Sequence, residues 1–342
     1  MANSTMQVWQ IRQFGPNAAG LERSERPVPQ PGPNELLVKI AAVSLNYRDK
    51  LIADGAYDPT FALPLVPASD AAGGVVAVGS NVTRFHVGDR VIGLFLPHWL
   101  DGDTRTNERS ATLGGPLPGV LGEYVVFDEQ AVVATPAYLD DREASTLPVA
   151  ALTAWTALFE HVRIKPGQTV LVEGTGGVSL FGLQFAAAAG ARVIVTSSSD
   201  AKLARSKALG AWATVNYSRH ERWDEQVLEL TNGRGVDHLL EVVGGSNGRR
   251  AARVLALGGN IALIGMLQDP LLSFEIVPFM LKHGVIRGVA VGNRTHFEAM
   301  NRALERAQLR PVIDAVYPFA EAQRAFEHLR SGPFGKVVIS LN

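Results

Sequence analysis

The sequence predicts an α/β protein in which a parallel-sheet domain is inserted into a β-rich domain. The first 150 residues read as short strands separated by Gly and Pro turns. From residue 151, apolar strands alternate with helical stretches, which indicates right-handed βαβ units and a parallel sheet. The tail from residue 291 resembles the first segment again. We therefore expect one domain at 1–150 plus 291–342 and a second at 151–290.

Length and composition agree with two soluble domains. The chain has 342 residues, 46% of them hydrophobic and 19% charged, which is typical of globular proteins. The 32 Lys and Arg nearly cancel the 33 Asp and Glu, so neither a nucleic acid nor a membrane is an expected partner. The chain has no cysteine, which excludes disulfides, thiolate nucleophiles and zinc sites built on Cys. Neither a signal peptide nor a transmembrane span is supported, so we expect a cytoplasmic protein.

The β-rich segment begins with strand patterns at 35–45, 71–82, 88–95 and 122–129. The polar segment Asp101–Gly119 is too long for a simple turn, and it is expected to be a surface lobe or an active-site loop. In the central segment, strands are expected at 168–174, 191–199, 236–245 and 260–267, with helices after the first three. A strand at 286–292 and an amphipathic helix at His296–Ala307 follow.

The stretch LVEGTGGVSLFGL, residues 171–183, reads as a strand, a glycine-rich turn and a helix. At a helix N-terminus, unpaired N–H groups and the positive end of the helix dipole favour an anion. A dinucleotide fingerprint would have a third glycine where this chain has Ser179, which is small enough to keep the close helix–strand packing. Alone, the motif leaves an ordinary strand-to-helix turn equally open. The predicted phosphate cradle comprises Gly174, Thr175, Gly176, Gly177, Val178 and Ser179.

The end of the next strand favours NADPH. An NAD-binding unit usually carries Asp or Glu there to hold the ribose 2′-hydroxyl, whereas this strand ends in four hydroxyl residues, 196–199. Hydroxyls followed by Lys202 suit a 2′-phosphate better, because a carboxylate would repel it. Lys202 is also open to a plainer interpretation, as a solvated helix residue.

Several landmarks occur in a familiar order: GDRVIG, LPVAALTAWTAL, GGVS, VDHLLEVVGG and HLRSGPFGKVVI. Over nearly its full length the chain resembles the medium-chain dehydrogenase/reductase superfamily. The resemblance implies a Rossmann-type coenzyme domain inserted in a GroES-like catalytic domain. It also implies a homodimer formed through the strand Ile286–Gly292, which would lie at the edge of the sheet.

The resemblance assigns cofactor contacts residue by residue. Thr153 would lie beside the nicotinamide, with Gly244 and Gly265 flanking it. The adenosine 2′-phosphate would be met by Ser197, Ser198, Lys202 and Tyr217. Lys336, in GKVV, would reach the cofactor phosphates.

The chain departs from the zinc alcohol dehydrogenases of this superfamily at every zinc ligand. Asn46, Ser69 and Val149 stand where those enzymes have Cys, His and Cys, and Asp70 follows in place of the Glu of Gly-His-Glu. The eight histidines show no metal-binding spacing. We therefore expect no metal, and the remaining pattern resembles the zinc-free quinone oxidoreductase branch, whose Asn-aromatic-x-Asp motif matches NYRD, residues 46–49.

Without a metal, hydrogen-bond donors must stabilise the charge that develops on the substrate oxygen. The candidate catalytic residues are Asn46, Tyr47 and Asp49. Each has a plainer interpretation: Asn46 as a turn residue, Tyr47 as a packing aromatic and Asp49 as a brace for the loop.

The expected activity is NADPH-dependent hydride transfer to a quinone or an α,β-unsaturated carbonyl, because a conjugated acceptor needs less electrophilic help than a saturated ketone. Two alternatives stay open. One is an alcohol dehydrogenase or aldehyde reductase of the same superfamily, and the other is an NADPH-binding protein with a structural, sensing or RNA-binding role.

Overall fold

The computed structural model describes residues 4–103 and 111–341. Part of the expected loop Asp101–Gly119 lies outside these ranges. The chain forms two compact units. We call Met1–Leu152 with Gly292–Asn342 the flanking unit, and Thr153–Val291 the central unit.

The flanking unit is built on a seven-stranded sheet in the order β16-β17-β3-β4-β5-β7, with β6 also paired to β3 and with β1 and β2 forming a separate hairpin. Its strands are β1 Thr5–Ile11, β2 Leu21–Pro27, β3 Glu35–Leu45, β4 Asp70–Val78, β5 Arg90–Gly93, β6 Tyr124–Asp128, β7 Val132–Ala134, β16 Ile313–Pro318 and β17 Lys336–Ser340. Its helices are α1 Tyr47–Ala53, α2 Asp141–Ala144, α9 Arg294–Ala307 and α10 Ala322–Arg330, with short turns η1 Pro16–Ala18, η3 Glu129–Ala131, η4 Leu147–Ala151 and η6 Phe319–Glu321.

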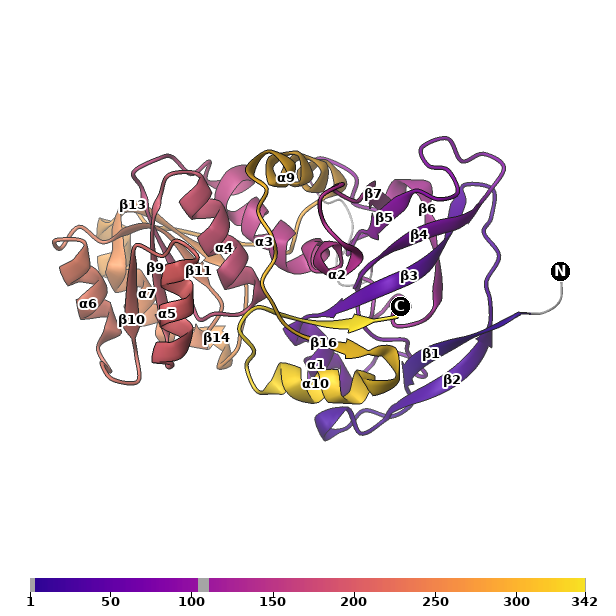
Figure 1. Cartoon of the computed structure of the whole chain (residues 1–342). Helices are drawn as coiled ribbons and strands as arrows, with labels where there is room; N and C mark the ends of the chain where they lie inside the picture. Colours follow the sequence, from indigo (N-terminus) through magenta and orange to yellow (C-terminus); the bar gives the residue numbers. More distant parts are fainter. Residues whose placement is uncertain (1–3, 104–110, 342) are drawn as a thin grey trace. The chain divides into compact units, whose positions relative to one another are not determined.

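Segments distant in sequence meet in the middle of this sheet. β17 pairs antiparallel with β3, with Val337 opposite Leu45 and Val338 opposite Ser44. On the other side of β3, Ser44 is opposite Asp70 of β4. The start of β17, the end of β3 and the start of β4 therefore lie side by side, as Figure 1 shows for the yellow β17 and the indigo β3.

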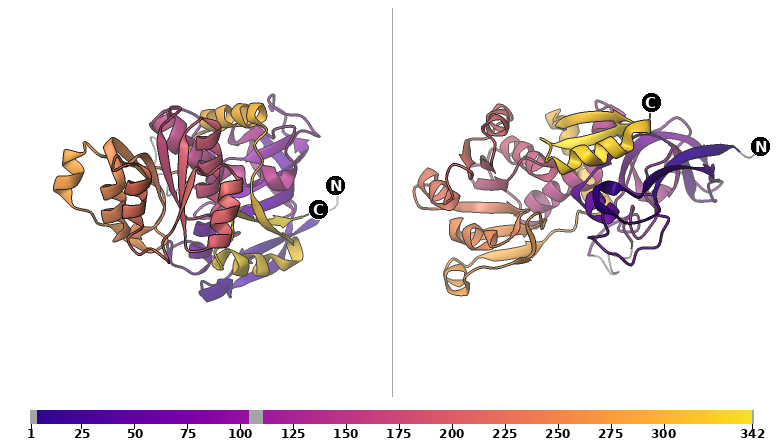
Figure 2. Two further views of the ribbon diagram at one scale, coloured as in Figure 1. Left: turned by 60° about the vertical axis from the view of Figure 1, so that its left-hand side comes forward. Right: turned by 90° about the horizontal axis from the view of Figure 1, so that it is seen from below.

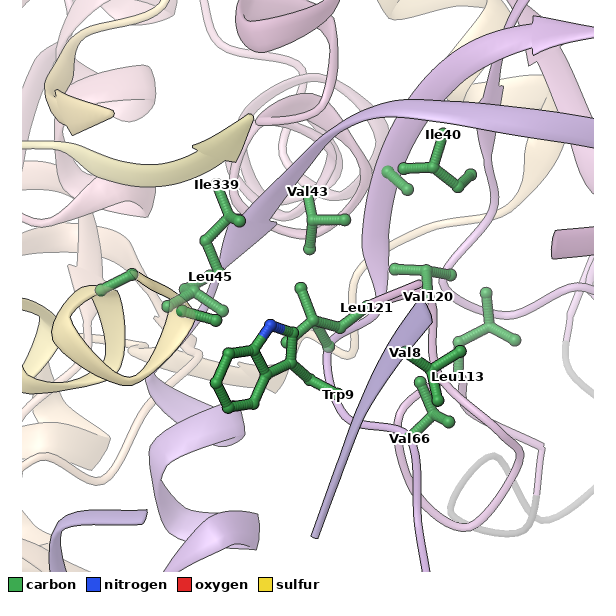
Figure 3. Packing of buried hydrophobic residues seen from close by; sticks show 14 of the residues in the cluster. Val8, Trp9, Ile40, Val43, Leu45, Val66, Leu113, Val120, Leu121 and Ile339 are labelled. Carbon is green, nitrogen blue, oxygen red and sulfur yellow. The ribbon is translucent and has the colours of Figure 1, made fainter. Parts of the chain in front are cut away.

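The core of the flanking unit is packed on one face of these strands. Figure 3 shows Val43, Leu45 and Ile339 from the paired strands gathered with Trp9 and Leu121. Trp9 satisfies its indole N–H by donating to the carbonyl of Phe319 at 2.8 Å. Burying each large aliphatic side chain stabilises the fold by about 1.5–3 kcal/mol, so this cluster anchors β17 to β3.

The amphipathic helix α9 follows the apolar spacing expected for His296–Ala307. Phe297, Met300 and Leu304 are buried at helical intervals. The side chain of Asn293 caps the helix by accepting a hydrogen bond from the amide of His296 at 2.8 Å, so the helix begins at Arg294.

The central unit is a six-stranded parallel sheet in the order β10-β9-β8-β11-β13-β15. The strands of this sheet are β8 Thr169–Glu173, β9 Arg192–Ser197, β10 Ala213–Asn216, β11 Val236–Glu241, β13 Leu255–Leu263 and β15 Val285–Gly288. Two further strands, β12 Gly244–Gly245 and β14 Asp269–Leu272, pair with each other in a separate two-stranded sheet. Its helices are α4 Gly177–Ala188, α5 Asp200–Ala208, α6 Trp223–Leu230, α7 Asn247–Val254 and α8 Ile276–Leu281, and the turn η5 Thr156–His161 follows α3 Leu152–Trp155 at its start.

The strand order reverses beside β8. The crossovers from β8 through β10 run one way along the sheet, and those from β10 through β13 run back. Right-handed crossovers then place α4 and α5 on one face and α6 and α7 on the other, as Figure 2 shows. The crevice outside the carboxyl ends of β8 and β11 is a topological switch point, where ligands of such sheets bind.

The predicted α/β fold with a Rossmann-type parallel sheet is confirmed. Several details differ from the sequence interpretation: for example, β11 ends at Glu241 rather than at 245, and β13 spans Leu255–Leu263 rather than 260–267. The edge strand β15 ends at Gly288 rather than continuing to Gly292, and the β-rich segment contains the helix α1 directly after β3. Within residues 4–103 and 111–341, no helix combines the length and apolar character that crossing a membrane requires.

Candidate active site

The glycine-rich turn leaves β8 and enters α4 as the sequence predicts. Gly174 has φ +74°, and its amide donates to the carbonyl of Thr196 on β9 at 2.9 Å. A Cβ placed on Gly174 or Gly176 would meet nothing within 4 Å, so the backbone there faces open space. No side chain caps the N-terminus of α4, whose first residues are Gly177 and Val178. The turn therefore offers backbone N–H groups that a pyrophosphate fits.

Ser179 takes a different role from a third glycine. Its buried hydroxyl donates to the carbonyl of Glu173 at 2.7 Å, tying the first turn of α4 to the end of β8. The close approach of helix and sheet occurs one turn later, at Gly182, where a Cβ would lie 2.4 Å from Cδ1 of Leu240. Thr175 is also buried, within the turn.

The end of β9 presents the hydroxyl residues unequally. Ser197 is buried and its hydroxyl accepts from the amide of Ser199 at 3.3 Å, while the hydroxyl of Ser199 caps α5 by accepting from the amide of Lys202 at 3.4 Å. Ser198 is exposed, and so is the ring of Tyr217 beyond β10. Ser198 and Tyr217 thus lie open to a ligand, whereas Ser197 and Ser199 shape the backbone.

Asp200 is the first acidic residue after the end of β9, and its carboxylate already has partners. Its carboxylate accepts from Nδ2 of Asn216 at 2.6 Å and forms an ion pair with Arg219. Sequence reasoning did not identify Arg219 as a cation beside this strand end, because the ion pair joins the first residue of α5 to a loop beyond β10.

Two glutamates meet at the switch point. Glu173 ends β8 and Glu241 ends β11, and Asn247 donates from Nδ2 to Oε1 of Glu173 at 2.7 Å and to Oε2 of Glu241 at 2.9 Å. Oε1 of Glu241 accepts from the amides of Val243 and Gly244 at 2.6 and 2.8 Å. Burial, together with the neighbouring Glu241 carboxylate, raises the pKa of Glu173 well above its usual range. The pair therefore holds a proton at a pH at which an ordinary glutamate is ionised.

The sequence interpretation missed this carboxyl pair. A signal was available, because both glutamates are the last residues of apolar strands and neighbouring parallel strands end at the same edge of a sheet. Gly244 follows the pair with φ +78°, and a Cβ there would lie 2.1 Å from the carbonyl oxygen of Asp269, so only glycine fits. Gly265 packs closely against Val242, and Thr153 is buried on α3.

In the flanking unit, Asn46, Asp49 and Lys336 come together. The backbone N–H of Asn46 donates to Oδ2 of Asp49 at 2.7 Å, and this hydrogen bond completes the first turn of α1. The ammonium of Lys336 donates to the carbonyl of Leu45 at 2.7 Å and to Oδ1 of Asn46 at 2.5 Å. Nδ2 of Asn46 is buried and, among the residues that the structure describes, makes no hydrogen bond of regular geometry, although it lies near enough to the Asp70 carboxylate to favour its ionised form.

Charge surrounds this cluster. Asp70 is fully buried, and it accepts from the hydroxyl of Ser69 at 2.7 Å and from the amide of Val149 at 3.1 Å. Burial raises the pKa of Asp70, and the Lys336 ammonium opposes that rise. Burial lowers the pKa of Lys336, and the carboxylates of Asp70 and Asp49 oppose that shift. Burial also raises the pKa of Asp49 to about 6, against the attraction of Arg48.

Tyr47 and Arg48 differ in availability. The ring of Tyr47 is 36% exposed, next to the ammonium of Lys50. The guanidinium of Arg48 donates to the carbonyls of Leu113 and Gly115 and lies over the ring of Phe95. Arg48 therefore anchors the loop that contains Leu113, while Tyr47 keeps an accessible side chain.

The ammonium of Lys336 contacts Leu45 and Asn46. Its predicted contact with the cofactor phosphates stays a prediction. The predicted roles of the other cofactor and catalytic residues likewise stay predictions.

The residues at the positions of the zinc ligands do not fit zinc. Asn46 and Ser69 supply neither thiolate nor imidazole, and Oδ1 of Asn46 already faces a buried ammonium that would repel a cation. Across residues 4–103 and 111–341, no group of three or more His, Asp or Glu could hold a metal ion.

The chain thus combines a glycine-rich turn at the switch point of a parallel sheet with a separate β-rich unit, as is expected of a nucleotide-dependent oxidoreductase. Comparison with known proteins agrees. Residues 32–137 match the alcohol dehydrogenase GroES-like domain, and residues 177–306 match the zinc-binding dehydrogenase family. The chain belongs to the medium-chain dehydrogenase/reductase superfamily, and it is an oxidoreductase of that superfamily.

Individual relatives cover nearly the whole chain. A zinc-type alcohol dehydrogenase-like protein of Schizosaccharomyces pombe is 42% identical over 94% of this chain and 95% of its own length. A quinone oxidoreductase of Pseudomonas aeruginosa is 32% identical over 88% of this chain and 89% of its own length. The crystal structure of a putative alcohol dehydrogenase from Sinorhizobium meliloti is 48% identical with a TM-score of 0.94, covering 100% of both chains. The predicted superfamily and the GroES-like domain are confirmed, and the family implies a nicotinamide cofactor.

Proposed function

We propose that this protein is an NADPH-dependent, zinc-independent reductase of quinones or α,β-unsaturated carbonyls. The observation that carries the proposal is the side-chain amide of Asn46, which stands at the position of a zinc ligand in the zinc alcohol dehydrogenases of the superfamily. The Lys336 ammonium holds its oxygen, and its buried Nδ2 lies beside the Asp70 carboxylate without a regular hydrogen bond among the described residues. A buried N–H group without a regular hydrogen bond is costly, and such groups are found where a ligand supplies the acceptor.

Bound NADPH would supply the hydride. The residues of this chain would hold the carbonyl oxygen of the acceptor, with Nδ2 of Asn46 donating to the charge that develops there. The phenol of Tyr47, a residue that is 36% exposed, is the second donor that we propose. Removing one such donor from an enzyme typically lowers kcat about 10²- to 10³-fold.

The preference for NADPH rests on the end of β9. Hydroxyls stand where a ribose-binding carboxylate is usual, and the nearest carboxylate, Asp200, is already engaged by Asn216 and Arg219. Ser198, Lys202 and Tyr217 are the residues that we propose for the 2′-phosphate.

We also propose a homodimer, formed through the edge of the central sheet. β15 is the edge strand, and the neighbouring helix α8 exposes Ile276, Val277, Met280 and Leu281. Contiguous exposed apolar side chains of this kind mark a protein interface. The cytoplasmic location expected from the sequence stays a prediction.

The second candidate activity, oxidation of alcohols or reduction of aldehydes, is favoured by the names of two similar proteins, from Schizosaccharomyces pombe and Sinorhizobium meliloti. A nucleotide-binding protein without catalysis is the third candidate.

One screen separates the three candidates. Initial rates of NADPH and NADH oxidation would be measured with benzoquinones, cyclic enones, aldehydes and simple ketones, with metal analysis of the same sample. We expect turnover of the conjugated acceptors with NADPH, and a lower NADPH-to-NADH preference in Lys202→Ala. Turnover confined to alcohols and aldehydes would favour the second candidate. Tight NADPH binding without turnover of any acceptor would favour the third.

A further inference from the structure

The ammonium of Lys336 is a buried charge that the sequence interpretation assigned elsewhere. Lys336 is 3% exposed, and it stands at the start of β17, in register with Asn46 just beyond the Leu45–Val337 pair. Strands β3 and β17 lie next to each other in Figure 3, where Leu45 and Ile339 mark them. The Lys336 ammonium donates hydrogen bonds to the carbonyl of Leu45 and to Oδ1 of Asn46, at the end of β3.

An ammonium decides which way the Asn46 amide faces. Lysine has three donors and no acceptor, so the amide atom that meets it must be the oxygen. The amide nitrogen then points away from Lys336, on the side of the Asp70 carboxylate, and among the described residues it makes no hydrogen bond of regular geometry. If Lys336 were apolar, the amide oxygen would lose its donor, and only the Asp70 carboxylate would still favour this orientation of the amide.

The surrounding carboxylates favour the charged form of Lys336, against the effect of its burial. Asp70 and Asp49 act on it electrostatically, and Asp70 is itself held by Ser69 and Val149. A buried ammonium without such partners would be strongly destabilised in its charged form. The cluster therefore supports a permanent donor at Oδ1 of Asn46.

We propose that Lys336 is a positioning residue that acts through Asn46, orienting its amide so that Nδ2 is presented to the substrate oxygen. The proposal rests on the proposed function for the identity of the substrate, but the orientation of the amide does not depend on it. It differs from the cofactor-phosphate contact that family resemblance implies for Lys336.

The test is a double-mutant cycle with Lys336→Met, which keeps the length of the side chain and removes the charge, and Asn46→Ala. Lys336→Met is expected to lower kcat by roughly 10- to 100-fold and to leave the Kd of NADPH, measured by fluorescence titration, within a few fold. In the Asn46→Ala background, Lys336→Met is expected to cause no further loss, because Lys336 acts only through that amide. Lys336→Arg, which retains a donor, is expected to recover part of kcat.

A readout without substrate tests the same proposal. The side-chain amide resonances of Asn46, identified in ¹⁵N spectra by their loss in Asn46→Ala, are expected to be single and sharp in the wild type and shifted or broadened in Lys336→Met. Unchanged resonances in Lys336→Met would overturn the proposal. The proposal would also be overturned if the fold-losses of kcat caused by Lys336→Met and Asn46→Ala multiplied in the double variant. A Lys336→Met protein that keeps its kcat but binds NADPH with a higher Kd would instead support the contact with the cofactor phosphates.

Val338→Ala is the matched control. Val338 is fully buried two residues along the same strand, so this variant is expected to lower Tm while keeping kcat and the Asn46 resonances. Absence of wild-type turnover with every conjugated acceptor would refute the proposed function alone, since the resonances would still decide the role of Lys336.

Discussion

Asp49 holds the first turn of α1 with a carboxyl group that is wholly buried. Its Oδ2 accepts a hydrogen bond from the backbone N–H of Asn46, and the guanidinium of Arg48 lies 3.8 Å from its Oδ1. Burial of the carboxyl group outweighs the attraction of Arg48 and the hydrogen bond from the Asn46 backbone, so the pKa of Asp49 rises to about 6.

This pKa gives a pH-dependent stability. Between the ordinary value of 3.8 and about 6, native Asp49 keeps a proton that the unfolded chain releases. Stability contributed by the protonated form is therefore lost as the pH rises through that window. Relative to Asp49→Asn, which cannot titrate, the wild type should lose up to about 3 kcal/mol of unfolding free energy between about pH 4 and about pH 7. Urea unfolding of both proteins measures this, and a constant difference would contradict it.

Ser179 gives a second prediction at the scale of one residue. Ser179→Gly removes its hydrogen bond to the carbonyl of Glu173 but leaves the N-terminus of α4 open. We expect NADPH affinity to stay within a few fold and the unfolding free energy to fall by about 1–2 kcal/mol. Ser179→Ala separates the lost hydroxyl from the backbone freedom of glycine. A collapse of NADPH binding in the glycine variant would show that the hydroxyl belongs to the cradle.

At the scale of secondary-structure elements, the neighbouring strands β8 and β11 end at the switch point and bring Glu173 and Glu241 together. Glu173→Gln should replace the shared proton by an amide donor toward Glu241. Because the wild-type pKa is raised, native Glu173 holds a proton that the unfolded chain releases above its ordinary value of 4.5. The variant should therefore gain stability relative to the wild type as the pH rises from acidic to neutral. Thermal unfolding across this range measures it; a Tm for the variant that is lower by the same amount at every pH would contradict it.

Helix α8 gives a prediction about assembly. Met280 is 62% exposed, and Val87, in the flanking unit, is also 62% exposed, so the same substitution can be compared at two equally accessible apolar positions. Met280→Glu should convert the dimer to a monomer in sedimentation velocity, because it places a charge in an apolar interface. Val87→Glu should leave the dimer intact. A wild-type monomer, or an unchanged Met280→Glu dimer, would contradict the proposed interface.

At the scale of the whole molecule, the zinc question has a direct test. Prolonged dialysis against a strong zinc chelator should leave both kcat and Tm unchanged, because the ammonium of Lys336 and the neutral groups of Asn46 and Ser69 do not form a zinc site. Loss of activity that added Zn²⁺ restores would show that a metal takes part after all.

The sequence was sufficient where the signal is local. The glycine turn, the hydroxyl-rich end of β9 and the NYRD motif are each read from a few consecutive residues, and the parallel sheet follows from alternating strands and helices. The contacts of Lys336 with Asn46 and of Glu173 with Glu241 could not be read in this way. They depend on which strands become neighbours, and β17 pairs with β3 across nearly the whole length of the chain.

That pairing has a consequence for biosynthesis. β3 is made early and its partner β17 very late, with the entire central unit translated between them. Until residues 336–340 emerge from the ribosome, β3 lacks one neighbour and Asn46 lacks the ammonium that orients it. A nascent chain can therefore fold its central unit first, while the cluster of Asn46, Asp49 and Lys336 stays incomplete until translation has passed β17.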